Sequence, residues 1–256
     1  MKKLLIASLL AATGVVQAAE VLDGNLTGNM TITSNYVYRG ISMSQNGPAV
    51  QGGIDYAHKS GLYIGNWNSS FRTVPNLSND DIDATSNVQM NVYGGWKKDI
   101  YKGLTVDAGY NTLNFPTASK MGDKTDYNTA EFYGAISYKP LTVKYSQTTT
   151  NYFGLNNSSG TQYLQADIKQ SLGLVNDKLK DLSLVAHYGN TKVANHSNLN
   201  YNDINAGLVY AFPQQWDLSV VYYTNTAMSK QFQAANSWNG SKYYSNTTVV
   251  SLTKSF

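Results

Sequence analysis

Charged side chains recur along this sequence inside segments where apolar and polar residues alternate. In an extended strand, residues two positions apart lie on the same face, so this spacing gathers the charges on the polar face. On the wall of a narrow interior, such charges would select ions and small polar molecules by charge. The candidate lining residues are Arg39, Asp55, Asp107, Glu131, Lys144, Asp167, Lys169 and Asp203.

Arg39 has two interpretations. It is either a guide for solutes at the mouth of the interior or a brace that pairs with Asp55 or Asp107. An unpaired charge in a confined space is costly, which favours the brace. The acids outnumber the cations in this set, so the sequence predicts a weak preference for cations.

Catalytic and metal-binding patterns are weak in this chain. The histidines are His58, His187 and His196, and none stands with a recognisable nucleophile pattern. The sequence contains no cysteine, which excludes disulfides and thiolate metal sites. An acidic cluster at 80–83 lacks the spacing of a calcium-binding loop. We therefore predict no enzymatic activity, no catalytic residue, no metal site and no cofactor.

The composition restricts the remaining classes. Charged residues make up 14% of the 256 residues, against roughly 25% in soluble domains. The arginines are Arg39 and Arg72 and the formal net charge is +3, which argues against a nucleic-acid groove. Tyrosine, with 20 residues, and glycine, with 21, are abundant, as is typical of many strands joined by turns.

The N-terminus predicts a cleaved secretory signal peptide over residues 1–18. Lys2 and Lys3 precede an apolar segment from Leu4 to Val16, and Ala18 ends a small-residue cleavage pattern. Residues 19–256 are expected to form one domain. No later stretch is long enough for a spanning helix, which leaves a soluble secreted protein or a transmembrane barrel.

The alternation predicts twelve antiparallel strands with one apolar and one polar face. Leu62 and Ile64 compete with Tyr63 and Trp67 for the apolar face of one strand, so its facing stays open. The expected strands are 30–38, 50–56, 62–69, 88–96, 104–111, 130–138, 141–146, 164–169, 182–188, 204–212, 216–222 and 247–256.

A β-sandwich would show the same alternation, but three features favour a transmembrane barrel. Connections alternate between tight periplasmic turns and longer polar extracellular loops. The chain ends on Phe256 within an alternating strand, which suggests an assembly signal read by the barrel assembly machinery. Aromatic residues stand near strand ends on the apolar parity, as at a membrane interface: Tyr38, Tyr56, Trp96, Tyr138, Tyr210 and Trp216.

Several segments together resemble the TorF family of proteobacterial outer-membrane porins. The most specific block runs from Ser34 to Ser42 and continues from Asn46 to Gly53. Shorter matches are 61–65 with Trp67, 131–134 and 152–154. The resemblance implies an outer-membrane location and a pore. Members often carry acids where this chain has Gln89 and Asn91, so it implies nothing firm about charge on that strand.

The sequence therefore predicts an integral protein of the bacterial outer membrane that passes small hydrophilic solutes or ions by passive diffusion. Its expected partners are outer-membrane lipid, the assembly machinery and the solutes, with a homo-oligomer left open. The alternative is a non-conducting barrel that is purely structural or acts through its extracellular loops in binding or adhesion. Phe232 and Trp238, in the loop from Thr226 to Lys242, belong either to such an interface or to an inward plug.

Overall fold

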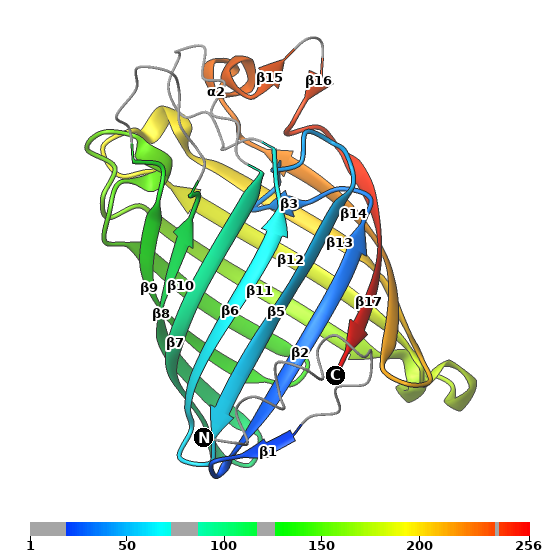
Figure 1. The fold of residues 1–256 in the computed structure, drawn as a ribbon. Coiled ribbons are helices and arrows are strands. Elements are labelled where there is room, and N and C mark those ends of the chain that lie inside the picture. Colours follow the sequence, from blue (N-terminus) through cyan, green and yellow to red (C-terminus); the bar gives the residue numbers. More distant parts are fainter. Residues whose placement is uncertain (1–18, 73–86, 117–125, 239–240) are drawn as a thin grey trace.

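Twelve long antiparallel strands close into a barrel, because the last of them, β17, pairs with the first, β2 (Figure 1). The structure is a computed structural model that describes residues 19–72, 87–116, 126–238 and 241–256. The predicted fold is confirmed. The barrel strands are β2 (Gly24–Thr33), β5 (Ala49–His58), β6 (Leu62–Ser70), β7 (Val88–Tyr101), β8 (Leu104–Asn114), β9 (Thr129–Tyr138), β10 (Leu141–Thr148), β11 (Gln162–Ser171), β12 (Leu182–Lys192), β13 (Tyr201–Phe212), β14 (Trp216–Thr226) and β17 (Thr247–Ser255).

Neighbouring strands are joined alternately at the two ends of the barrel. One end, the short-turn rim, carries the turns at 59–61, 102–103, 139–140 and 213–215, and the C-terminus lies there (Figure 1). The connection between β11 and β12 at this rim is longer and holds two 3-10 helices, η2 (Leu172–Leu174) and η3 (Asp177–Leu179). The opposite end, the long-loop rim, carries all the remaining connections between barrel strands. A short strand, β1 (Ala19–Val21), pairs with the start of β2.

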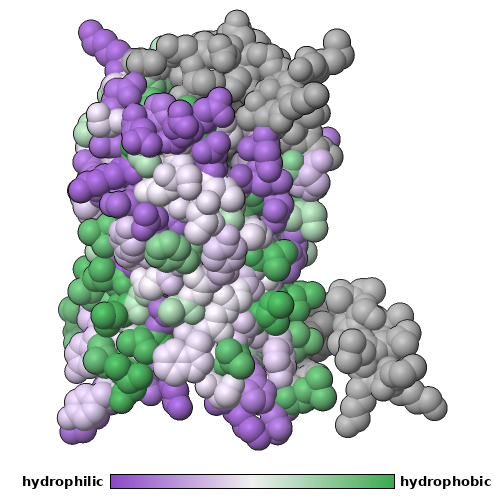
Figure 2. Space-filling model, turned by 90° about the vertical axis from the view of Figure 1, so that its left-hand side faces the viewer, coloured by the Kyte–Doolittle hydropathy of each residue, from purple (hydrophilic) through white to green (hydrophobic). Residues whose placement is uncertain are grey.

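Apolar side chains on the outer wall form a band around the barrel. Figure 2 shows these side chains concentrated in the lower part of the wall, with hydrophilic ones toward the long-loop rim. The facing of β6 is now settled, since Leu62 and Ile64 are 58% and 59% exposed on this outer face. Trp67 points inward, where its ring meets Tyr36 at 5.4 Å between centroids.

The first strand differs from the prediction, because β2 covers 24–33 rather than 30–38. After Thr33 the chain leaves the wall and folds into a loop that the Asn35 side chain holds. Asn35 Oδ1 accepts hydrogen bonds from the hydroxyls of Ser42 at 2.7 Å and Ser44 at 3.0 Å. The alternation of Tyr36 and Tyr38 therefore continues past the end of the strand.

Three of the loops at the long-loop rim close this end of the barrel. They carry a hairpin of β3 (Val37–Tyr38) and β4 (Ile41–Ser42), the 3-10 turn η1 (Tyr152–Gly154) and the helix α2 (Lys230–Ala235), which lies above the strand ends (Figure 1). Two further short strands, β15 (Ser237–Trp238) and β16 (Ser241–Lys242), pair beyond α2, and η4 (Ser197–Leu199) lies between β12 and β13. Among the described residues, no helix has the length and hydropathy to cross a membrane.

Candidate functional site

The interior of the barrel is divided into an apolar layer near the long-loop rim and a polar layer below it. The apolar layer combines buried side chains of the wall with those of the infolded loops, and we call it the cap. Its members come from the loops of this rim and from strand ends on several sides of the barrel, so the cap extends across the lumen. They are Tyr36, Ile41, Met43, Ala49, Phe71, Leu113, Phe115, Tyr127, Tyr152, Phe153, Val193, Leu199, Tyr201, Phe232 and Tyr243.

Aromatic contacts join the parts of the cap. Phe153 of η1 lies 5.8 Å from Phe115, between ring centroids, and Phe232 of α2 lies 5.3 Å from Tyr201 of β13. Phe232 is fully buried, so this loop residue faces inward, whereas Trp238 lies on β15. Burial raises the pKa of the Tyr152 phenol, and neighbouring Arg39 offsets only part of this rise. Tyr152 therefore stays neutral within the cap.

The hairpin of β3 and β4 crosses the lumen and is tied to the far wall by Arg39. Arg39 and Gly40 form its two-residue turn, with positive φ values of 45° and 76°. Arg39 Nη2 donates to both carboxylate oxygens of Glu131 on β9, at 2.8 and 3.0 Å. Both side chains are buried, with 7% and 3% exposed. The guanidinium also stacks over the Tyr163 ring of β11, 4.1 Å from its centroid.

Arg39 therefore forms a brace, but the predicted partners were wrong. The sequence pointed to Asp55 or Asp107, whereas the structure pairs Arg39 with Glu131. We expected Arg39 on a barrel strand, but it lies at the tip of the infolded hairpin. Asn225 on β14 donates its amide to the Gly40 carbonyl at 2.5 Å and holds the other flank of this tip.

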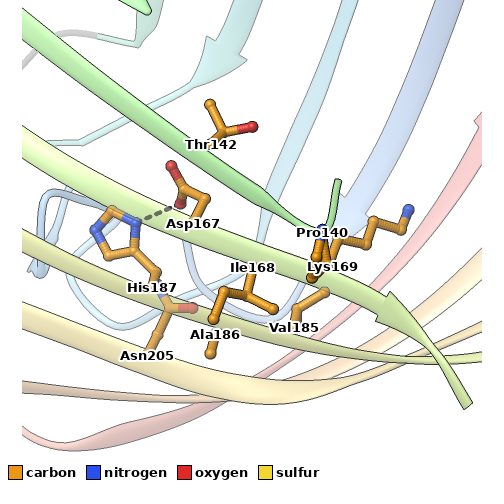
Figure 3. Close-up of a pocket in the computed structure, with 9 residues that line it drawn as sticks. All are labelled: Pro140, Thr142, Asp167, Ile168, Lys169, Val185, Ala186, His187 and Asn205. Atoms are coloured by element: carbon orange, nitrogen blue, oxygen red, sulfur yellow. Dashed lines mark hydrogen bonds and ion pairs between the residues drawn. The ribbon is translucent and has the colours of Figure 1, made fainter. Parts of the chain in front are cut away.

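Below the cap, His187 of β12 bridges two acids of the candidate set. Its Nδ1 lies 2.6 Å from Asp167 Oδ1, the contact drawn in Figure 3, and its Nε2 lies 3.0 Å from Asp203 Oδ1. Tyr163 donates its hydroxyl to the same Asp203, at 3.1 Å. A carboxylate at each ring nitrogen favours the form of the imidazole in which both nitrogens donate, and the Tyr163 hydroxyl also lies 2.9 Å from Nε2.

The second polar group lies on the other side of the lumen, around Asp55 and Asp107. Tyr93 donates its hydroxyl to Asp55 at 2.6 Å, and Tyr63 donates to Asp107 at 2.7 Å. The Tyr63 hydroxyl also contacts that of Tyr133. Lys144 Nζ lies over the ring of Tyr133, 4.0 Å from its centroid.

Cavities open between this polar layer and the short-turn rim. One of about 260 Å³ is lined by Asp167, Lys169 and His187 (Figure 3), and another of about 580 Å³ also includes Lys169. A third, of about 420 Å³, is lined by Asp55, Asp107 and Lys144. The structure thus divides most of the candidate set into groups, and Lys169 lines the first two of these cavities.

Lys97 also lines two of these cavities, although the sequence reasoning left it out. The predicted strand ended at Trp96, whereas β7 continues to Tyr101. Lys97 follows an outward-facing residue, so the parity rule, applied one residue further, would have placed it on the inner wall.

The aromatic residues predicted for the membrane interface divide into two groups. Five of them lie on strands close to the short-turn rim. The Trp96 indole N–H donates to the Ser60 carbonyl at 3.1 Å, and the Tyr56 hydroxyl donates to the Leu22 carbonyl at 2.7 Å. Tyr138, Tyr210 and Trp216 are 62%, 41% and 37% exposed on the outer wall.

The sixth aromatic residue, Tyr38, is a correction. It lies on β3 inside the barrel and packs against the cap, with its ring 6.1 Å from that of Phe153. The reason is that the barrel strand stops at Thr33, so the parity of the wall no longer applies to Tyr38.

The end of the chain completes the closure of the barrel. Phe256 donates its backbone N–H to the Gly28 carbonyl at 2.9 Å and accepts from Gly28 in return. Lys254, on the outer wall, extends its ammonium to the Gln214 carbonyl in the neighbouring turn. The charge thus reaches the rim, as expected for a lysine that snorkels.

Within the described part of the chain, no group of His, Asp or Glu residues is arranged to hold a metal ion. The acidic cluster at 80–83 lies outside the described residues, as does the predicted signal peptide at 1–18. His58 contacts the Ser60 hydroxyl in an exposed turn, and His196 contacts a loop carbonyl.

Residues 19–256 match a family described as "Bacterial protein of unknown function (Gcw_chp)", and the chain belongs to this family. The match does not confirm the TorF family of the sequence resemblance. No curated protein matches the chain.

Solved structures of porins share the fold at low sequence identity. The KdgM porin in complex with disordered oligogalacturonate has a TM-score of 0.53 and 10% identity, covering 90% of this chain and 98% of its own. The NanC porin has a TM-score of 0.51 and 9% identity, covering 89% and 97%. At this identity the likeness shows the fold alone.

Proposed function

We propose that this protein is an outer-membrane channel for the passive diffusion of small hydrophilic solutes. The observation that carries the proposal is the barrel itself, which has an apolar outer band and a charged inner wall with cavities. Lipid excludes unsatisfied backbone groups, and a closed barrel satisfies them all. The porin folds found among solved structures support the same reading.

The cap makes the proposed channel a gated one. It fills the long-loop end, which is the extracellular end in the usual orientation of such barrels, while the cavities lie toward the periplasmic end. Passage of a solute requires the infolded loops to move. The Arg39–Glu131 pair and the Asn225–Gly40 hydrogen bond are then contacts that must break for the hairpin of β3 and β4 to leave the lumen.

The inner wall favours weak ion selectivity. The candidate set alone predicted a preference for cations, but Lys97 and His187 add positive charge to the same wall. Capture of acidic sugars is disfavoured as well. Carboxylate recognition prefers a free arginine fork, and the Arg39 fork is already bonded to Glu131.

A second candidate is a barrel that does not conduct. The specific observation in its favour is the cap, whose buried aromatic side chains leave the lumen filled at one end. Such a protein would act through its loops or as a structural element. The predicted signal peptide, the assembly signal at Phe256 and any oligomer remain part of the proposal in both cases.

Swelling of liposomes that contain the refolded protein tests the proposal. A channel lets small uncharged solutes enter, so vesicles swell at a rate that falls as the solute grows. We expect swelling with glycerol and slower swelling with a disaccharide, and faster swelling when the hairpin is released by Glu131→Gln. Correctly folded barrels that give no swelling in either form would favour the non-conducting candidate.

A further inference from the structure

A cavity of about 420 Å³ on the inner wall presents charges of both signs. It lies between β5 and β10, below the cap, and extends to Gly61 at the short-turn rim. Asp55 and Asp107 supply two carboxylates, and Lys97 and Lys144 supply two ammonium groups. These four side chains come from four different strands, so the barrel closure brings them together.

These opposite charges are not joined as ion pairs, although Lys97 lies directly across from Asp107 on the neighbouring strand. Among the described residues, none of the four forms an ion pair within 4.0 Å. This contrasts with Glu131, His187, Asp167 and Asp203 on the same wall, which are all paired, Glu131 with Arg39 of the hairpin. Charges that are partly removed from water gain from an opposite partner. The cavity therefore offers two kinds of unoccupied charge to a ligand.

Neighbouring aromatic side chains hold these charges in place. Tyr93 and Tyr63 each donate a hydroxyl to one carboxylate, at 2.6 Å for Asp55 and 2.7 Å for Asp107. The ring of Tyr133 supports Lys144 at 4.0 Å. A phenol that donates to a carboxylate orients it, so both carboxylates are held in position.

The strand register keeps Asp107 and Lys144 apart. Asp107 pairs with Ala135 of β9, and Ala135 pairs with Lys144 of β10. Two steps across a sheet separate the backbones by roughly 10 Å. The small Ala135 side chain between them leaves room for a ligand that contacts both groups.

We propose that this cavity binds small zwitterionic solutes, of the α-amino acid class, as they pass through the lumen. The ammonium group of the solute meets Asp55 or Asp107, and its carboxylate meets Lys97 or Lys144. A simple anion would face two carboxylates, and a simple cation would face two lysines, whereas a zwitterion is complementary to both. The proposal rests on the proposed channel function, whose solute it specifies.

Calorimetric titration of the refolded protein in detergent micelles at low salt tests the site. The probes are L-alanine, propionate and ethylammonium at neutral pH. We expect L-alanine to bind about tenfold more tightly than either singly charged analogue, because only it uses both sets of charges. Equal binding of all the probes, or no binding of L-alanine, would overturn the proposal.

Paired variants assign the two halves of the site. Asp55→Asn with Asp107→Asn should abolish the advantage of L-alanine over propionate, and Lys97→Gln with Lys144→Gln should abolish its advantage over ethylammonium. Lys178→Gln removes an exposed lysine of η3 that does not line this cavity and should leave binding unchanged. If both paired variants retain full binding, the cavity is not the site.

Binding and conduction fail separately in this design. Selective binding of L-alanine without conductance would support the site and contradict the channel function. Conductance without selective binding of L-alanine would support the channel function and contradict the site.

Discussion

At the scale of single residues, the interior depends on charge pairs that strands or loops far apart in the sequence bring together. Arg39 and Glu131 are the clearest case, since both are buried and each is the other's ion-pair partner. By contrast, the ion pair of Asp23 and Lys59 lies on the surface, with 67% and 69% of the side chains exposed. Exposed pairs contribute little to stability, whereas a buried charge that loses its partner is costly.

Glu131→Gln should therefore loosen the hairpin of β3 and β4. The neutral amide cannot match the guanidinium charge, so Arg39 gains by moving to water. We expect faster amide hydrogen exchange over residues 36–44, with the barrel strands unchanged. The matched control, Asp23→Asn, should leave exchange in the hairpin unaltered. Equal protection of the hairpin in wild type and Glu131→Gln would contradict the role of the pair.

His187→Gln should destabilise the barrel wall itself. His187 sits between Asp167 and Asp203, and its loss leaves two carboxylates facing each other without a cation. We expect a loss of about 3 kcal/mol in the free energy of unfolding, measured by urea denaturation in lipid vesicles. His58→Gln, at the end of β5, should change it by no more than about 0.5 kcal/mol. A similar loss for both variants would show that the bridge carries no special stability.

At the scale of strands, glycines determine where the inner tyrosines lie. Tyr133 lies across Gly109 of the neighbouring strand, where an added Cβ would meet the tyrosine hydroxyl at 2.6 Å. Tyr63 lies across Gly95 in the same way. Each glycine thus provides the space in which a phenol can reach its carboxylate or its neighbour.

Gly109→Ala should displace Tyr133 and cost about 1–3 kcal/mol of unfolding free energy, as overpacking does. The same Cβ would also meet the Gly94 carbonyl at 2.6 Å, so the strand cannot simply absorb it. Gly134→Ala is the matched control, since the nearest atom to its new Cβ is 4.0 Å away. Urea midpoints of the two variants in the same lipid decide the matter. A Gly109→Ala midpoint equal to that of Gly134→Ala would exclude the packing argument.

The strands could be predicted from sequence because their signal is local. Residues two apart share a face, so the outward position of Val250 and Leu252 follows from alternation alone. Lys97 was missed because the predicted strand stopped one residue short of it. The pairing of Arg39 with Glu131 has no such local signal, since these residues are 92 positions apart and meet only because a hairpin crosses the lumen.

At the scale of the whole molecule, the proposed channel function depends on the loops that form the cap. Phe153 and Phe232 are loop residues whose aromatic side chains gave no indication of direction in the sequence. The structure buries both in the cap, with 3% and 0% exposed. The central claim is therefore that a conducting pore lies beneath a cap that can be displaced.

Single-channel conductance in planar bilayers tests this claim most directly, on wild type and on Phe153→Asp combined with Phe232→Asp. Two unpaired carboxylates in an apolar cluster should displace η1 and α2 from the cap. Ala234→Asp, at an exposed position on α2, is the control and should behave as wild type. We predict brief, infrequent opening steps for wild type and long, larger steps for the double variant. A folded double variant that shows no steps would contradict the account.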